Sequence, residues 1–309
     1  MPSHAFVQCD VFTDRAFGGN PLAVFPDGRG IDDATMQKIA REMNLSETVF
    51  VLPPGDPGKA LRRLRIFTPT TELPMAGHPV VGTWHVLALQ GVVPAPASGA
   101  GSVTIQQELG VGILPVAIEF AGGAPVRVVM TQPPPRLAER PDLAGAAARA
   151  LGLDPAEIAT AALPLVVAST GVPYLVVPVR GRAALARIAV READLVNCLD
   201  DAKASGLYAV SLETRAPDAL ASTRMLGPPA IGVAEDPATG SAAGPLAAAL
   251  VHHGVVRPVD GVARFVIEQG VDMGRPSRIE AEVEGGPGAV RTVRIAGGSV
   301  VVIEGELRW

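Results

Sequence analysis

The segments Glu72-Leu73-Pro74-Met75-Ala76-Gly77-His78 and Glu235-Asp236-Pro237-Ala238-Thr239-Gly240-Ser241 share one pattern, Glu-x-Pro-x-x-Gly followed by a polar residue. Each segment runs into a stretch rich in Ala, Val and Leu that closes on a glycine, Gly91 in the first copy and Gly254 in the second. Two loops of matching spacing, each opening a helix, predict a chain built from two similar halves.

The start of each predicted helix favours negative charge. The first N–H groups of a helix have no partner within it, and they add to the positive end of the helix dipole. Ser241 is a favoured N-cap residue, whereas His78 takes that place in the first copy and puts Pro79 at the first helical position. Gly77 and Gly240 allow the backbone to turn and to approach a ligand closely. The pair of loops therefore predicts a site for a small acid; the alternative is that they hold only the turn glycines and caps of two buried helices.

Composition limits the functional classes. The chain has 309 residues, of which 48% are hydrophobic and 18% charged, so it can bury a core in each of two domains. A net charge of −5 without a basic stripe argues against a nucleic-acid partner. The longest apolar stretch, around Ala242 to Val251, is too short to span a bilayer, and the N-terminus lacks the pattern of a signal peptide. We therefore expect a cytoplasmic protein with no membrane partner.

The cysteines and histidines indicate no metal site. Cys9 and Cys198 lie far apart in apolar surroundings, which excludes a disulfide framework and a thiolate metal cluster. Cys9 falls in a predicted strand and is expected to be a small buried residue. The five histidines have no spacing typical of metal ligands, and the chain has no GxGxxG, Walker or HExxH motif.

The remaining pattern alternates strands with few helices. A helix is predicted after Asp32 and Asp33, with Asn44 as a left-handed stop and a bend at 45–48 before the next strand. Each half has several strands and one apolar helix, which favours an α+β fold with a mostly antiparallel sheet wrapped around a central helix. The predicted division is 1–125 plus about 299–309 for the N-terminal half and 126–298 for the C-terminal half.

Five motifs together carry a resemblance to a known family: Phe17 to Val24 (FGGNPLAV), Asn44 to Thr48 (NLSET), Glu72 to Thr83 (ELPMAGHPVVGT), Val233 to Ala242 (VAEDPATGSA) and Gln269 to Ser277 (QGVDMGRPS). In this order they resemble the PhzF family of phenazine-biosynthesis-like isomerases. The resemblance extends from Phe12 to the final strands. It implies the diaminopimelate epimerase-like fold, in which two pseudo-symmetric halves have the active site in the cleft between them.

The resemblance also assigns roles to individual residues. Glu47 matches the family's proton-shuttling carboxylate, a role that its place at a helix-to-strand bend does not suggest. His78 and Asp236 match the groups that hydrogen-bond the substrate and assist the proton shift. The residues expected to bind the substrate or to line the cleft are Gly77, Gly240, Ser241, Ser46, Asn20 and Thr239.

These roles predict an isomerase that needs no cofactor. A carboxylate that removes and returns a carbon-bound proton needs a pKa raised toward neutrality, and two helix N-termini can stabilise charge that develops on a small carboxylate-bearing substrate. In the best-known reaction of the family, the substrate is a dihydro-hydroxyanthranilate. Family analogy and the prevalence of twofold oligomers predict a homodimer.

Two other functions stay open at this point. The first is an amino-acid or imino-acid epimerase of the same fold. Cysteine-dependent members of that fold place a Cys before each motif glycine, where this chain has Ala76 and Thr239, so a two-thiol mechanism is excluded and a mechanism through Glu47 and Asp236 remains. The second is a non-catalytic protein that binds a small ligand, which would have no need of an acid/base carboxylate.

Overall fold

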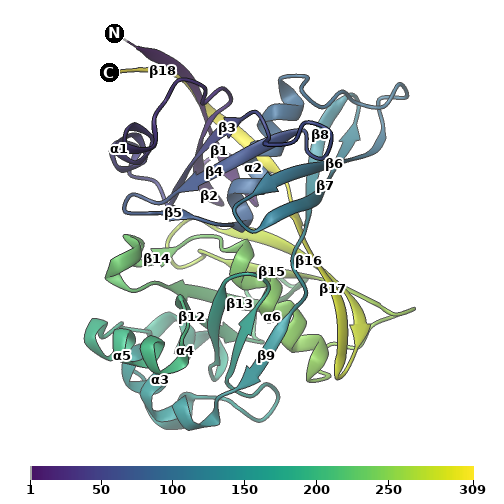
Figure 1. Cartoon of the computed structure of the whole chain (residues 1–309). Coiled ribbons are helices and arrows are strands. Elements are labelled where there is room, and N and C mark those ends of the chain that lie inside the picture. Colours follow the sequence, from purple (N-terminus) through teal and green to yellow (C-terminus); the bar gives the residue numbers. More distant parts are fainter. Residues whose placement is uncertain (1) are drawn as a thin grey trace. The chain divides into compact units, whose positions relative to one another are not determined.

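The computed structural model describes residues 2–309, and the chain divides into two compact units (Figure 1). The N-terminal unit comprises Met1–Thr131 and Ala296–Trp309, and the C-terminal unit comprises Gln132–Ile295. The first boundary falls after Thr131 rather than after residue 125, because the strand that ends there pairs with the preceding strand of the N-terminal unit. The second falls before Ala296 rather than near residue 299, and the N–H of Phe12 donates to the carbonyl of Gly298 at 2.9 Å.

The N-terminal unit is a sheet around one helix. In chain order its elements are β1 (Ser3–Val11), β2 (Asn20–Phe25), α1 (Asp33–Met43), β3 (Glu47–Leu52), β4 (Arg62–Phe67), β5 (Glu72–Leu73), α2 (Gly77–Leu89), β6 (Gly101–Leu109), β7 (Gly112–Ala121), β8 (Ala124–Thr131) and β18 (Ser299–Arg308). The strands pair in the order β18-β1-β2-β3-β4-β6-β7-β8, and only the β2–β3 and β4–β6 pairs are parallel. Helix α2 packs against β1, β2, β3, β7, β8 and β18, so the sheet curves around it.

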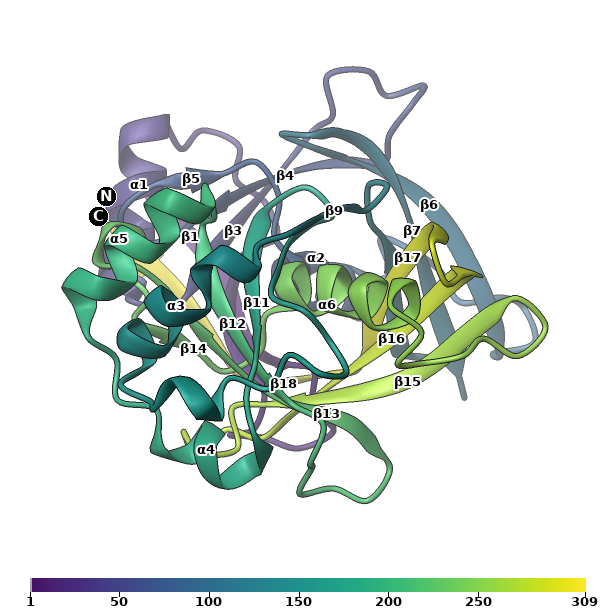
Figure 2. The same ribbon diagram turned by 90° about the horizontal axis from the view of Figure 1, so that it is seen from below.

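The C-terminal unit repeats this plan. Its elements are β9 (Arg136–Glu139), α3 (Ala144–Leu151), β10 (Val166–Ser169), β11 (Pro173–Pro178), α4 (Gly181–Arg187), α5 (Glu192–Ala202), β12 (Gly206–Ser211), β13 (Ala219–Leu226), β14 (Glu235–Asp236), α6 (Gly240–His252), β15 (Val262–Gln269), β16 (Ser277–Gly286) and β17 (Ala289–Gly297), with short 3₁₀ turns at Pro141–Leu143, Pro155–Glu157 and Pro229–Ile231. Helix α6 packs against β9, β10, β11 and β16, and Figure 2 shows it alongside β16.

The two units share a topology strand by strand. The series β1 to β6 pairs antiparallel, parallel, antiparallel, antiparallel at the two-residue strand β5, and parallel from β4 to β6. The series β10 to β15 pairs in the same sequence, with β14 in the place of β5 and α6 in the place of α2. The predicted repeat of a loop and an apolar helix is therefore a repeat of the whole fold, and the predicted α+β class is confirmed.

The two central helices are buried from their first residue. Each has 13 residues, and their apolar composition on all faces suits a helix surrounded by sheet. The predicted caps were wrong by two residues, because the N-cap positions are Ala76 and Thr239, and His78 and Ser241 are the second residues of their helices. The side chains of His78 and Ser241 contact neighbouring strands instead of capping their own helices.

Helix α1 follows its local sequence signals. The carboxylate of Asp32, the N-cap residue, accepts the N–H of Thr35 at 2.9 Å. Asn44 ends the helix in the left-handed conformation with φ of 51°, as predicted. The next strand, β3, begins at Glu47 rather than at residue 49, so Glu47 is the first strand residue and not part of the bend.

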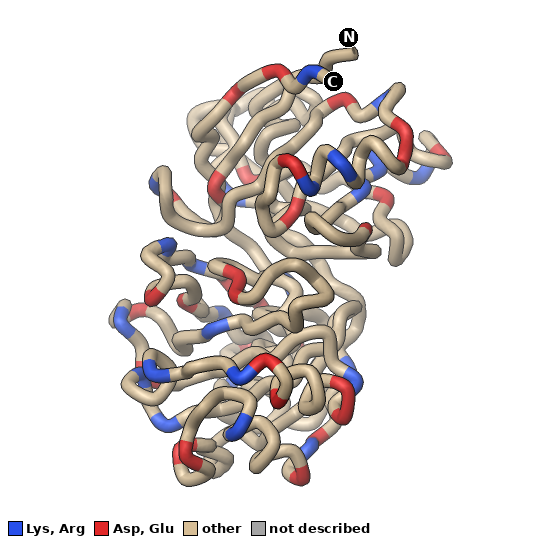
Figure 3. Tube along the Cα trace, turned by 90° about the vertical axis from the view of Figure 1, so that its left-hand side faces the viewer, with Lys and Arg blue, Asp and Glu red and all other residues tan. Residues whose placement is uncertain are grey.

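Charge and helix length set no part of the chain apart. In the view of Figure 3, acidic and basic residues are interspersed along the chain. Within residues 2–309, no helix combines the length and apolarity needed to cross a membrane.

Cys9 in β1 and Cys198 in α5 are both buried. Burial raises the pKa of the Cys198 thiol to about 11 and raises the pKa of the Cys9 thiol further.

The tight packing of α2 gives a prediction for Gly82. A Cβ atom at this position would lie 2.6 Å from Cγ2 of Val11 and 2.7 Å from Cδ2 of Leu22. We expect Gly82→Ala to lower the free energy of unfolding by about 1–3 kcal/mol, the cost of overpacking a core. Urea unfolding followed by circular dichroism measures the change.

The control is the same substitution at an exposed helical glycine. At Gly145 in α3, the nearest atom to a new Cβ would be Nη1 of Arg149 at 3.7 Å. Gly145→Ala should raise the free energy of unfolding by about 0.5–1 kcal/mol through helix propensity. Equal effects of the two substitutions would contradict the packing described for α2.

Candidate active site

Glu47 stands at one end of the parallel pair β2–β3. It is opposite Leu22 in the register, two residues beyond the first residue of β2, Asn20. Adjacent parallel strands start at the same edge of a sheet, so Asn20 and Glu47 are brought to one place. Ser46 immediately precedes Glu47 and is partly buried.

His78 lies between these two residues. Its Nδ1 is 3.1 Å from Nδ2 of Asn20, and its Nε2 is 3.1 Å from Oε2 of Glu47. The side chain of His78 is 3% exposed and that of Glu47 is 13% exposed. Three of the site residues predicted for this unit, each from a separate motif, therefore meet at the His78 ring.

Burial decides the charge of the imidazole. It lowers the pKa of His78 from 6.5 to about 3, so the ring is neutral near pH 7. A neutral imidazole has one donor and one acceptor nitrogen. Because the amide N–H of Asn20 faces Nδ1, Nδ1 is the acceptor and the proton sits on Nε2, toward the carboxylate of Glu47.

A second cluster lies in the C-terminal unit around Asp236. The hydroxyl of Thr239 donates to Oδ2 of Asp236 at 2.5 Å, and both side chains are buried. Asp236 belongs to β14 and Thr239 precedes the first residue of α6, Gly240. The motif thus folds its carboxylate and its hydroxyl onto each other at the start of the central helix.

Gln269, the last residue of β15, fixes the direction of that hydrogen bond. Its Oε1 accepts the N–H of Thr239 at 3.1 Å and the hydroxyl of Tyr208 at 2.9 Å. Its Nε2 must then donate, to the carbonyl of Asp236 at 2.6 Å and to the Thr239 hydroxyl at 2.9 Å. Since that hydroxyl oxygen accepts from Gln269, its single hydrogen points to the carboxylate of Asp236.

The second helical residue is held in the same way in both units. Ser241 takes the place of His78, and its Oγ lies 2.9 Å from the hydroxyl of Tyr174 near the start of β11. Strand β11 is the counterpart of β2, which supplies Asn20 to His78. One scaffold therefore presents an imidazole in the N-terminal unit and a hydroxyl in the C-terminal unit.

Some residues that shape these clusters were absent from the sequence-based prediction. Gln269 opens the motif Gln269 to Ser277, which carried the resemblance without a role for the glutamine. Gln132 had no predicted role, yet its Nε2 donates to the carbonyl of Gly240 at 2.9 Å and its Oε1 accepts the hydroxyl of Thr170. Both contacts join segments far apart in sequence, so no local pattern indicates them.

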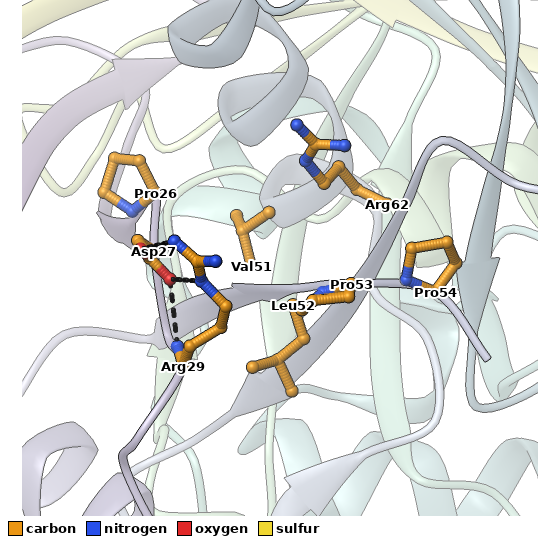
Figure 4. A pocket seen from close by; sticks show the side chains of 8 residues that line it. All are labelled: Pro26, Asp27, Arg29, Val51, Leu52, Pro53, Pro54 and Arg62. Atoms are coloured by element: carbon orange, nitrogen blue, oxygen red, sulfur yellow. Dashed lines mark hydrogen bonds and ion pairs between the residues drawn. The ribbon is translucent and has the colours of Figure 1, made fainter. Parts of the chain in front are cut away.

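A surface pocket of the N-terminal unit lies elsewhere. It has a volume of about 400 Å³ and is lined by residues near the far end of β3, including Leu52, Pro53 and Arg62 (Figure 4). The Asp27–Arg29 ion pair closes one side of it. None of the predicted site residues lines this pocket. Across residues 2–309, no group of three or more His, Cys, Asp or Glu side chains is arranged to hold a metal ion.

Comparisons with known proteins agree with the fold. The sequence profile of the phenazine biosynthesis-like proteins (PhzC-PhzF) matches residues 9–305. The chain belongs to the PhzF family. An uncharacterized isomerase of Mesorhizobium japonicum is 39% identical over 99% of both chains. The trans-2,3-dihydro-3-hydroxyanthranilate isomerase of Pseudomonas aeruginosa is 37% identical over 98% of this chain and 99% of its own.

A solved structure supports the same assignment. The PhzF-family phenazine biosynthesis protein of Bacillus anthracis superposes with a TM-score of 0.88 at 27% identity, and each chain is covered completely. The present protein is therefore an enzyme of the isomerase class within the PhzF family.

The buried neutral His78 gives a prediction for the pH dependence of stability. Its folded-state pKa of about 3 lies below the unfolded value of 6.5, so the unfolded chain binds the proton first as the pH falls. The stability due to the neutral ring is fully present above about pH 6.5 and is lost toward pH 3. We expect His78→Gln to remove up to about 1.4 kcal/mol per pH unit from the slope of unfolding free energy between these values.

The measurement is urea unfolding of the wild type and His78→Gln at a series of pH values from 7 down to 4.5. Other groups titrate in this range in both proteins, so the difference between the two slopes isolates His78. Parallel slopes would show that His78 binds a proton equally well in the folded and unfolded states, and would contradict its burial as a neutral ring.

Proposed function

We propose that the protein moves a proton within a small carboxylate-bearing substrate, with Glu47 as the acid/base group. The observation that carries this proposal is the contact between Glu47 and His78, in which a neutral, buried imidazole lies 3.1 Å from the carboxylate. Because its pKa is about 3, His78 is a poor base and serves as a hydrogen-bond donor. Glu47 is then the group of this pair that can accept a proton.

The proposed step is balanced without any further reactant. Glu47 takes a proton from a carbon next to an unsaturated, carboxylate-bearing group, and the electron pair of the broken C–H bond enters the conjugated system. The protonated Glu47 then returns the proton to another carbon of the same system, so that the double bond moves. The substrate and product are isomers, and the carboxylate of Glu47 is regenerated.

The start of α2 supports binding of the substrate carboxylate. Among the described residues, no side chain caps this helix at Ala76, and its first turn holds no acidic residue. Its first N–H groups, including those of Gly77 and His78, therefore favour an anion. The helix N-terminus also stabilises the negative charge that spreads through the substrate when the proton leaves.

The C-terminal unit supplies the second part of the proposal. Asp236 is buried, its Oδ2 accepts the Thr239 hydroxyl, and α6 starts without a side-chain cap or an acidic first turn in the described chain. We assign Asp236, Thr239, Gly240 and Ser241 to recognition of polar groups of the same substrate. The substrate named for the relative from Pseudomonas aeruginosa, trans-2,3-dihydro-3-hydroxyanthranilate, is of the required kind, an unsaturated acid with further polar groups.

The test is deuterium uptake in D₂O, followed by mass spectrometry. The panel contains dihydro-hydroxyanthranilate together with cyclic and acyclic unsaturated amino and hydroxy acids. We expect the wild type to incorporate deuterium at carbon and to shift a double bond. Glu47→Gln should lower the rate by about 10²–10⁴-fold, the usual contribution of a general acid/base.

The matched control is Glu42→Gln, which makes the same change at an exposed residue of α1 and should keep full activity. Chiral chromatography of the products separates isomerisation from epimerisation, since an epimerase accumulates both stereoisomers and leaves the double bond in place. Full activity of Glu47→Gln on a substrate that the wild type turns over would refute the role of Glu47.

A further inference from the structure

The glutamate that opens each Glu-x-Pro-x-x-Gly motif is held by an arginine from the neighbouring strand. Nε and Nη2 of Arg65 in β4 donate to the two carboxylate oxygens of Glu72 at 2.8 and 2.7 Å. Nε and Nη2 of Arg224 in β13 donate to the two oxygens of Glu235 at 2.8 and 2.7 Å. The two units thus repeat one fork-to-fork contact.

The register of the strands places these pairs identically. Glu72 is opposite Phe67, and Arg65 lies two residues before Phe67 on the same face of β4. Glu235 is opposite Leu226, and Arg224 lies two residues before Leu226 on β13. The two-residue strands β5 and β14 are therefore fixed both by backbone pairing and by a bidentate side-chain contact.

The third nitrogen of each guanidinium reaches a helix beside the sheet. Nη1 of Arg65 donates to Asp33, the first residue of α1. Nη1 of Arg224 donates to the carbonyl of Leu185 at 3.0 Å and to that of Ile188 at 3.3 Å, at the end of α4. Helices α1 and α4 both follow equivalent strands, β2 and β11, so each arginine ties a motif loop to the same part of the fold.

The arginine side chains of these two contacts are much less exposed than that of a surface ion pair such as Arg264–Glu282. The side chains of Arg65 and Arg224 are 13% and 14% exposed, whereas that of Arg264, whose Nε contacts Glu282 at 2.7 Å, is 69% exposed. Bidentate arginine–carboxylate pairs are stronger and more directional than contacts through a single nitrogen. An exposed pair such as Arg264–Glu282 contributes little to stability and constrains little.

Both arginines lie one short segment away from the site residues. Helix α1, which Arg65 holds at Asp33, leads through Asn44 to Glu47, and the loop that begins at Glu72 leads to His78. Arg65 therefore joins the two chain segments that bring Glu47 and His78 together. Glu235, held by Arg224, directly precedes Asp236.

We infer that Arg65 and Arg224 are positioning residues, each of which holds one motif loop so that the polar residues of that loop keep their reactive geometry. Neither arginine touches the reacting atoms in this account, and the catalytic consequence of the inference rests on the proposed function. The effect on the loops themselves does not rest on it.

The test replaces each arginine with lysine and with methionine. Lysine keeps the charge but cannot form the two parallel hydrogen bonds, so charge and geometry are separated. In Arg65→Lys we expect amide hydrogen exchange, measured by peptide mass spectrometry, to become at least about tenfold faster in the segment from Glu72 to His78 and to stay unchanged in the segment from Glu235 to Ser241. In Arg224→Lys the reverse is expected, with faster exchange in the segment from Glu235 to Ser241 and none of this change in the segment from Glu72 to His78. Exchange in the affected loop should be faster still in the methionine variants.

The kinetic readout is the split between kcat and KM in the deuterium-uptake assay. A displacement of about 1 Å in a reacting group lowers the rate by up to about 10²-fold, so kcat should fall about 10–100-fold in either lysine variant while KM changes little. Arg264→Lys, the matched control, should alter neither loop exchange nor kcat.

Each outcome bears on the inference. Unchanged exchange in both loops, or faster exchange with unchanged kcat, overturns the positioning role. Faster exchange in the expected loop together with a lower kcat supports it. If the loops loosen as expected but the wild type shows no Glu47-dependent proton transfer on any substrate, the arginines do hold the loops and it is the proposed function that fails.

Discussion

The complete burial of one apolar helix in each unit is the constraint on which the rest of this structure depends. Because α2 and α6 are enclosed from their first turn, a polar side chain there must find its hydrogen-bond partners inside the protein. The ring of His78 lies 3.1 Å from both Asn20 and Glu47, and the hydroxyl of Ser241 lies 2.9 Å from that of Tyr174. The same burial keeps the imidazole neutral, and polar side chains from separate strands gather around the start of the helix.

Much of the fold could be predicted from the sequence because its signals are local. Asp32 caps the start of α1 and Asn44 ends it, each through a contact within a few residues. The apolar stretches after the two motifs become α2 and α6. The helix starts were misplaced because a hydrogen-bonding residue beside a glycine resembles an N-cap. The side chains of His78 and Ser241 bind strands far away in sequence, which no local pattern reveals.

The candidate site was predictable only in part for the same reason. Glu47 follows a helix stop, where a carboxylate is usually solvated, and the resemblance to a family was needed to single it out. Its contact with His78 depends on the parallel pairing of β2 with β3, a non-local feature. Gln269, Arg65 and Arg224 act through contacts across strands and loops, so their residue types alone gave no indication of a role.

The central claim is that a neutral His78 presents its Nε2–H to the carboxylate of Glu47. The most direct test is nitrogen-15 NMR of the histidine side chains at neutral pH, with the His78 signal assigned from a His78→Gln variant. We expect a neutral ring with the proton on Nε2 and with Nδ1 accepting from Asn20, and no protonation as the pH is lowered to about 5. A protonated ring at pH 7, or a neutral ring with its proton on Nδ1, would show that His78 does not direct an N–H toward Glu47.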